Sequence, residues 1–160
     1  MKQRTMACAL LSGLLLATAA VAAKPAAPKP LQGQVTEVLD GQSLRLQPAE
    51  GAAMIVRLEG IEAPLSCQEH GAAARLALQG LVLQQSVTLS SPSRDAHGHL
   101  VATVMLGDRN VNRAQVEEGW AFSERVKWDR GPYVKEERVA AALRRGMNAT
   151  GTPETPARFP

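Results

Sequence analysis

The chain has 160 residues, of which 45% are hydrophobic and 21% are charged, and its formal net charge is +3 at pH 7. This length allows one domain with a real hydrophobic core. The small net charge argues against a protein that binds nucleic acid through overall basicity, because such proteins usually carry a strong basic patch.

The first 23 residues show the three parts of a secretory signal peptide. Lys2 and Arg4 form the positive start, residues 6–21 form an apolar run, and small residues up to Ala23 offer a cleavage site. The run is too short and too rich in small residues to favour a membrane span, and an uncleaved anchor is the alternative. We expect cleavage near Ala23, export to the periplasm or the medium, and no transmembrane segment in the mature chain.

Cleavage at this site would remove two positive charges and one of the two cysteines. The net charge then falls to +1, with the positive excess in residues 124–160 and a negative excess in residues 24–123. Cys67 is left alone in an oxidising compartment, where it is either an inert, half-buried residue or the site of a disulfide to another chain. No feature of the sequence predicts an oligomeric state.

The mature chain divides into a linker, one domain and a tail. Residues 24–30 form a proline- and alanine-rich linker that should be extended. The domain follows at residues 31–148, and residues 149–160 form an irregular tail that contains three prolines.

Apolar and polar residues alternate in three short segments at the start of the domain, which predicts strands that are buried on one face. The segments are residues 35–38, 44–46 and 54–58. Asp40-Gly41 between the first two segments is a signal for a tight hairpin. The loops at residues 40–43 and 59–65 should therefore lie at the same end of a curled sheet, where chemistry is usually placed.

The rest of the domain predicts two more strands and three helices. The strands are residues 86–89 and 100–105, and the helices are residues 72–85, 111–118 and 133–145. Gly119 should end the second helix in the C-terminal capping position, and Pro132 is well placed to open the third. Gly80 inside the first helix suggests that this helix packs closely against the sheet.

Two motifs lie at the predicted end of the sheet. The turn reads Asp40-Gly41-Gln42-Ser43, and the loop runs from Arg57-Leu58 to Glu62-Ala63-Pro64-Leu65. Both motifs resemble those of the staphylococcal (thermonuclease-like) nuclease family. The resemblance extends over nearly all of the mature chain. It implies a β-barrel with helices, of the α+β class: a five-stranded OB-fold with one helix after strand 3 and two C-terminal helices.

Hydrolysis of phosphodiesters in that family needs a calcium ion held by carboxylates, a base for the attacking water and two arginines on the phosphate. The resemblance places the metal ligands at Asp40, Gln42 and Glu62. Of these, Gln42 lacks the carboxylate charge and Glu62 is one methylene longer than the family residue. We therefore expect a weakened calcium site, and the sequence establishes no cofactor.

The catalytic positions that the resemblance implies are altered as well. Arg57 preserves the first phosphate-binding arginine, whereas Leu65 stands at the general-base position and cannot accept a proton. His99 stands where the second arginine is expected. Losing a base typically costs about 10²–10⁴ in rate, and losing one charge-stabilising donor costs about 10²–10³. We therefore expect nuclease activity to be lost or much reduced.

Two features leave a rebuilt catalytic site open. Glu69 lies four residues after Leu65 and would serve as a base, although a solvated carboxylate at the start of a helix is the ordinary interpretation. His97 and His99 are able to bind a metal ion, but the turn offers no third ligand for a zinc site. A working metal-dependent phosphodiesterase is therefore the alternative to an inactive form.

Ligand binding is predicted in the C-terminal third. Arg125, Lys127 and Arg130 begin a basic stretch in which Trp128 and Tyr133 are interleaved, and aromatic faces stack on bases. The ordinary interpretation of this stretch is a solvated helix with one apolar side. We interpret the chain as an exported nuclease-like module that binds nucleic acid or a nucleotide, with a purely protein partner as a further alternative.

Overall fold

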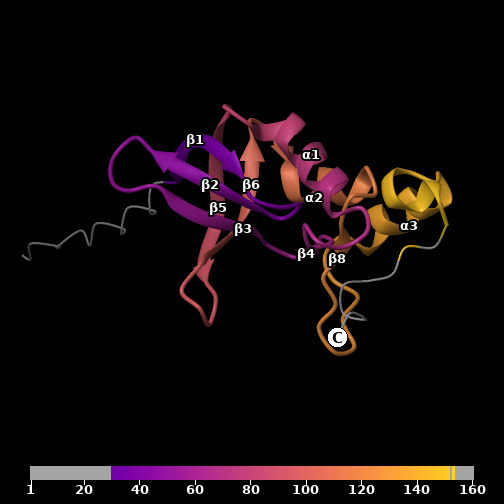
Figure 1. Ribbon diagram of the computed structural model, residues 1–160. Helices are drawn as coiled ribbons and strands as arrows, with labels where there is room; N and C mark the ends of the chain where they lie inside the picture. Colours follow the sequence, from indigo (N-terminus) through magenta and orange to yellow (C-terminus); the bar gives the residue numbers. More distant parts are fainter. Residues whose placement is uncertain (1–29, 152, 154–160) are drawn as a thin grey trace, which may run out of the picture.

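The computed structural model describes residues 30–151 and 153, and Figure 1 shows the arrangement of their elements. The predicted signal peptide, the predicted linker before Pro30 and most of the predicted tail lie outside the described residues. Within the described ranges, no helix combines the length and the apolar character that crossing a membrane requires.

Five strands form a closed barrel, as the sequence predicts. They are β1 (Leu31–Val38), β2 (Ser43–Pro48), β3 (Met54–Leu58), β5 (Ser86–Arg94) and β6 (Leu100–Leu106). Neighbouring strands run in the order β3-β2-β1-β5-β6 and pair in antiparallel fashion. A parallel pairing of β3 with β6 closes the sheet, and the two-residue strand β7 (Arg109–Asn110) continues from β6. The predicted OB-type barrel is therefore confirmed.

The hydrophobic core fills the inside of this barrel. Alternate residues of each strand point inward, as the period of two in the sequence requires. Val35, Leu44, Leu46, Val56 and Val104 are all 0% exposed and belong to one contiguous cluster. Burial of this kind is worth about 1.5–3 kcal/mol for each large aliphatic side chain, so the barrel holds the loops at its end in fixed positions.

Three helices follow the predicted order. They are α1 (Gly71–Val82), α2 (Val111–Glu117) and α3 (Val134–Ala142), and a 3₁₀ turn, η1 (Gly146–Ala149), follows α3. The Asn110 side-chain Oδ1 accepts a hydrogen bond of 2.9 Å from the Arg113 N–H and so caps the start of α2. Gly119 follows α2 with a φ of 74°, which confirms its predicted role in ending that helix. In Figure 1 the helices lie to one side of the barrel, with α3 farthest from it.

A second, two-stranded sheet connects the loop after β3 with the segment after α2. Its strands are β4 (Ile61–Glu62) and β8 (Phe122–Ser123), which pair in antiparallel fashion. The Glu124 N–H also donates a hydrogen bond of 2.9 Å to the carbonyl of Gly60. This sheet brings residues from the C-terminal third beside the loop that the sequence associates with chemistry.

Two local expectations are wrong. Gly80 is exposed, and a Cβ built there would meet nothing within 4 Å, so this glycine does not serve close packing of α1 against the sheet. Strand β5 is also longer than predicted and runs through Pro92 to Arg94. A change of register between Ser90 and Ser93 accommodates the proline, which has no N–H to donate to a regular ladder.

Candidate active site

The β1–β2 turn is held in one conformation by its own backbone and by close packing. The Asp40 carboxylate Oδ1 accepts a hydrogen bond of 2.8 Å from the Gln42 N–H, and the Leu39 N–H donates to the Ser43 carbonyl at 2.9 Å. A Cβ added to Gly41 would lie 2.8 Å from the Cβ of both Ala63 and Ala74. Gly41 is therefore required because no side chain fits there.

The Gln42 side chain joins this turn to the loop after β3. Its Oε1 accepts a hydrogen bond of 2.8 Å from the backbone N–H of Ala63, a residue that is only 2% exposed. The Gln42 carbonyl accepts a second bond of 2.8 Å from the Leu58 N–H. The two predicted loops do lie at the same end of the barrel, and a neutral amide bridges them.

A buried glutamine on α2 also holds the β1–β2 turn, and the sequence analysis did not identify it. The side chain of Gln115 on α2 is 0% exposed, and its Nε2 donates to the carbonyls of Gly41 at 3.0 Å and Ala74 at 3.2 Å. Its Oε1 has no partner among the described residues. The available signal was a polar side chain between the apolar residues Ala114 and Val116 on a short helix.

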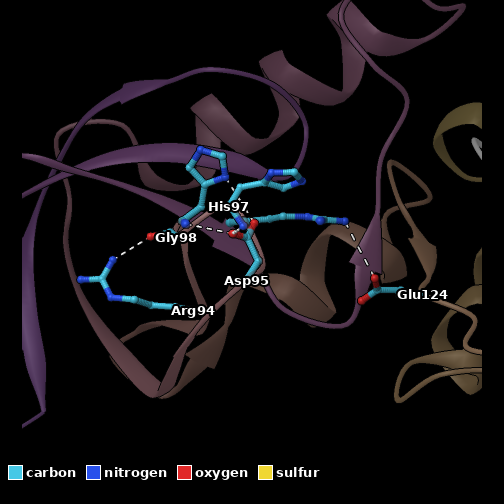
Figure 2. A network of polar contacts seen from close by, with 7 residues as sticks. Arg94, Asp95, His97, Gly98 and Glu124 are labelled. Atoms are coloured by element: carbon cyan, nitrogen blue, oxygen red, sulfur yellow. Dashed lines mark hydrogen bonds and ion pairs between the residues drawn. The ribbon is translucent and has the colours of Figure 1, made fainter.

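Arg57 points outward from β3 and meets an acidic side chain from the segment after β8. A guanidinium nitrogen lies 3.8 Å from Glu124 Oε1, and Figure 2 shows Glu124 reaching toward it. The two side chains are 37% and 41% exposed, so water screens the pair and its contribution to stability is small. Arg57 thus stays accessible, but part of its charge is already balanced.

Leu65 lies on the surface of the second loop. Its side chain is 50% exposed, and its backbone N–H donates a hydrogen bond of 2.7 Å to Gln68 Oε1. Glu69 Oε1 lies 3.5 Å from His70 Nε2, and the Glu69 side chain is 84% exposed. Because Leu65 does not fill a buried gap, a carboxylate at this position would meet water and not the core.

The two histidines lie in the turn between β5 and β6, organised by one carboxylate (Figure 2). Asp95 Oδ1 accepts hydrogen bonds of 2.9 Å from the N–H groups of His97 and His99, and Oδ2 lies 3.2 Å from His99 Nδ1. Partial burial alone would raise the pKa of the Asp95 carboxyl, but the backbone bonds from His99 and His97 and the His99 ring hold that pKa below its usual value. His99 is therefore committed to the turn in this conformation.

A hollow of about 360 Å³ lies between the β2–β3 edge and this turn. Arg45, Arg94 and His99 line it together with the exposed side chain of Ile55. Arg57 lies two residues beyond Ile55, so it projects from the same outward face of β3. Two guanidinium groups thus line the hollow itself, and Arg57 lies on the same face of β3.

Some of the residues predicted to bind nucleic acid are engaged within the molecule, and others are exposed. Arg125 forms an ion pair with Glu137 of α3, so its charge is engaged within the molecule. Lys127 and Arg130 are exposed on the segment between β8 and α3. Tyr133 is buried, with its N–H donating to Ser123 Oγ at 3.0 Å, and offers no face for stacking on a base.

Residues 55–148 match the family described as staphylococcal nuclease homologue. The chain belongs to the staphylococcal nuclease family. The matched range contains Arg57, Glu62, Leu65 and His99, whereas Asp40 and Gln42 lie before it.

Several curated proteins are similar to this nuclease-family chain. Protein ParB of Escherichia coli is 32% identical over 104 residues, which are 59% of this chain and 58% of that protein. An uncharacterized endonuclease of Haemophilus influenzae is 26% identical over 126 residues, 79% of this chain and 71% of that protein. Micrococcal nuclease of Shigella flexneri is 30% identical over 103 residues, 59% of each chain. The aligned part thus spans between 58% and 71% of these relatives.

The residues at the family metal position do not fit a calcium ion. Calcium takes six to eight oxygen ligands, several of them anionic. Here Asp40 and Glu62 alone supply carboxylates, one oxygen of Asp40 accepts the Gln42 N–H, and the Gln42 oxygen accepts the Ala63 N–H. Across residues 30–151, no three His, Cys, Asp or Glu side chains stand close enough together to hold a metal ion.

Proposed function

We propose that this chain is an exported member of the staphylococcal nuclease family that has lost most of its hydrolytic activity and acts as a binding module. We assign to it a ligand that carries phosphate, with nucleic acid or a nucleotide as the leading class. One observation carries the loss of activity: Gln42 Oε1 accepts the Ala63 N–H at 2.8 Å. An uncharged amide thereby holds together the two loops that a metal ion would otherwise share.

The chemistry at the other positions supports this proposal. Leu65 offers no lone pair that takes a proton from water, and His99 Nδ1 is held by Asp95 at 3.2 Å. Losing the base costs about 10²–10⁴ in rate, and losing the charge-stabilising donor costs about 10²–10³. The losses do not multiply freely, because the groups act as a unit. What remains at the site is Arg57, whose charge binds a phosphate but does not activate water.

The binding role is supported by the hollow lined by Arg45, Arg94 and His99. The Arg45 guanidinium donates to Glu37 at 2.9 Å across an exposed pair, and Arg94 donates to the Gly98 carbonyl at 2.7 Å. Each guanidinium has five N–H donors, so most of them stay available to an anion. A phosphate that enters the hollow would meet these donors without displacing a buried group.

Export is supported by the sequence alone, through the signal-like residues 1–23. The measurement is mass spectrometry of the native protein, which should give an N-terminus at Lys24 or Ala23. Recovery of the chain with Met1 from the cytoplasm would contradict export and leave the binding proposal unchanged.

An active metal-dependent phosphodiesterase is the second candidate. It is favoured by the retained Asp40, Arg57 and Glu62 and by relatives that are named endonuclease or nuclease. Clear cleavage of DNA by the natural protein, abolished both by a chelator and by Arg57→Ala, would establish it and reject the loss of activity.

The direct test restores the missing groups. The triple variant Gln42→Asp, Leu65→Glu and His99→Arg should gain calcium-dependent cleavage of single-stranded DNA, whereas the natural protein should show a negligible rate. Leu65→Gln in place of Leu65→Glu is the matched control, because it has nearly the same shape and no basic oxygen at neutral pH. A triple variant that folds and binds calcium but cleaves no better than this control would contradict the assignment of the lesions.

Binding is tested separately by titrating the natural protein with single-stranded DNA and with a nucleotide bisphosphate. Cationic side chains that contact DNA phosphates release counterions condensed on the DNA. The affinity for DNA must therefore fall steeply as the salt concentration rises. Arg94→Gln should weaken this binding, and Lys135→Gln on α3 is the control of equal charge. Absence of any binding to either ligand leaves only the protein-partner interpretation.

A further inference from the structure

A short hairpin between β8 and α3 has a well-defined backbone. We use "the tip" for residues 126–129. The Val126 N–H donates to the Asp129 carbonyl at 3.1 Å, and the Asp129 N–H donates back to the Val126 carbonyl at 2.9 Å. Lys127 and Trp128 form the turn, with Lys127 at a φ of 54°. Asp129 Oδ1 accepts the Gly131 N–H at 2.9 Å, which fixes the base of the tip.

The apolar side chains of the tip have no role in the fold. Trp128 is 98% exposed and Val126 is 63% exposed. A buried tryptophan normally contributes a large apolar area to a protein core, and here that area is left in water. Figure 1 shows the segment after β8, drawn in orange, projecting away from the barrel and the helices. The tip therefore presents an apolar surface outward on a narrow support.

The tip carries one cation and one anion, Lys127 and Asp129, and Arg130 directly after it adds a second cation. Lys127 and Arg130 are exposed, and neither forms an ion pair with another described residue. The acid of the tip, Asp129, uses one carboxylate oxygen in a hydrogen bond to the backbone. An apolar pair flanked by two available cations has the composition of a segment at a membrane–water interface.

We propose that the tip docks on a membrane surface that carries anionic phospholipids. Trp128 and Val126 enter the layer between headgroups and acyl chains, where the amphipathic indole is most stable. Lys127 and Arg130 contact the headgroup phosphates. The docking is peripheral, and it uses residues outside the candidate active site, so it does not depend on the proposed function.

The surroundings of the tip favour a lipid surface over a nucleic-acid strand. A base stacked on Trp128 would bring its neighbouring phosphates across the adjoining surface. That surface contains a hollow of about 420 Å³, and two carboxylates outside the tip, those of Glu59 and Glu124, line it. These charges repel a phosphate backbone, whereas a flat lipid surface needs to contact only the projecting tip.

The experiment measures co-sedimentation of the processed protein with vesicles of phosphatidylcholine that contain one third phosphatidylglycerol. Trp128→Ala should lower the partition coefficient at least tenfold, and Lys127→Gln should lower it about fivefold, as expected for one cation at an anionic surface. Two matched controls should change it less than twofold. These are Lys135→Gln, an exposed cation of α3, and Leu76→Ala, an exposed apolar residue of α1.

Tryptophan fluorescence tests directly whether the tip enters the bilayer. Vesicles should shift the emission of the parent protein to the blue, and lipids brominated in their acyl chains should quench it. Both effects should vanish in Trp128→Ala, which retains Trp120. Circular dichroism confirms that each variant is folded, as the exposure of Trp128 leads us to expect.

Three results would overturn the proposal. They are partitioning that Trp128→Ala leaves unchanged, equal partitioning onto pure phosphatidylcholine, and no binding to vesicles at all. An oligothymidine that quenches Trp128 while vesicles do not would also overturn it, and would assign the tip to nucleic acid.

Discussion

The hydrogen bond from the Ala63 N–H to Gln42 joins the two loops, and we expect it to hold them together without a metal ion. Replacing Gln42 by Ala removes the acceptor of a 2.8 Å hydrogen bond. The backbone N–H of Ala63, a residue that is 2% exposed, then has no partner. A buried donor left unsatisfied costs about 1–3 kcal/mol. For a domain of this size, such a loss lowers the melting temperature by about 4–10 °C.

The variant Gln42→Asp extends the test. Its side chain is one methylene shorter, and it adds a negative charge near Asp40 and Glu62, so in a chelator it should be at least as unstable as Gln42→Ala. Added calcium should restore part of the stability of Gln42→Asp, because the ion binds the folded state and neutralises the three carboxylates. The parent protein should melt at the same temperature in calcium and in chelator.

Differential scanning calorimetry of the three proteins, with and without calcium, provides the assay. Gln47→Ala is the control, because this exposed glutamine bonds only to nearby backbone carbonyls and its loss should cost less than about 0.5 kcal/mol. A parent protein that calcium stabilises by several degrees would refute the reasoning. So would a Gln42→Ala variant as stable as the control.

Three further predictions follow from the described contacts. Gln115→Leu removes the donor to two buried carbonyls and should lower the free energy of unfolding by about 2–4 kcal/mol in a urea titration. Glu124→Gln frees Arg57 and should strengthen binding of a nucleotide bisphosphate by up to about fivefold in calorimetry; a weaker affinity would contradict the role of this pair. Because the pKa of Asp95 is lowered from 3.8, its hydrogen bonds should persist above pH 4 and be lost as the pH falls through the lowered pKa. A carboxyl chemical shift that titrates at or above 3.8, or a His99 N–H signal that does not change with it, would refute this.

The barrel was predictable because its signals are local. Alternation of apolar residues marks the strands, and Asp40-Gly41 marks the turn that joins β1 to β2. The reason for the glycine was not visible, because its requirement is the space left by Ala63 and Ala74 and not a special φ. A turn residue that looks locally determined is thus fixed by residues more than twenty positions away.

The contacts of the candidate site were largely hidden from the sequence because they join distant segments. The sequence around Gln42 does not predict that its amide oxygen accepts the Ala63 N–H. The sequence around Arg57 likewise does not predict its ion pair with Glu124. The substitutions at family positions could be predicted one by one, because matching a residue to a motif position needs only the sequence. The partner that each side chain meets instead depends on how β4 and β8 are joined.

We expect the parallel pairing of β3 with β6 to link folding to the proposed ligand binding. Val56, Arg57 and Leu58 pair with Leu100, Val101 and Ala102, and the long chain between them must close before these hydrogen bonds form. Contacts of such high sequence separation slow folding, and we expect this seam to form late. Arg57 lies on the seam itself, opposite Val101. A molecule opened only there would retain its other strand pairs but separate Arg57 from Val101. The affinity for the proposed phosphate-bearing ligand should therefore report the closure of the barrel.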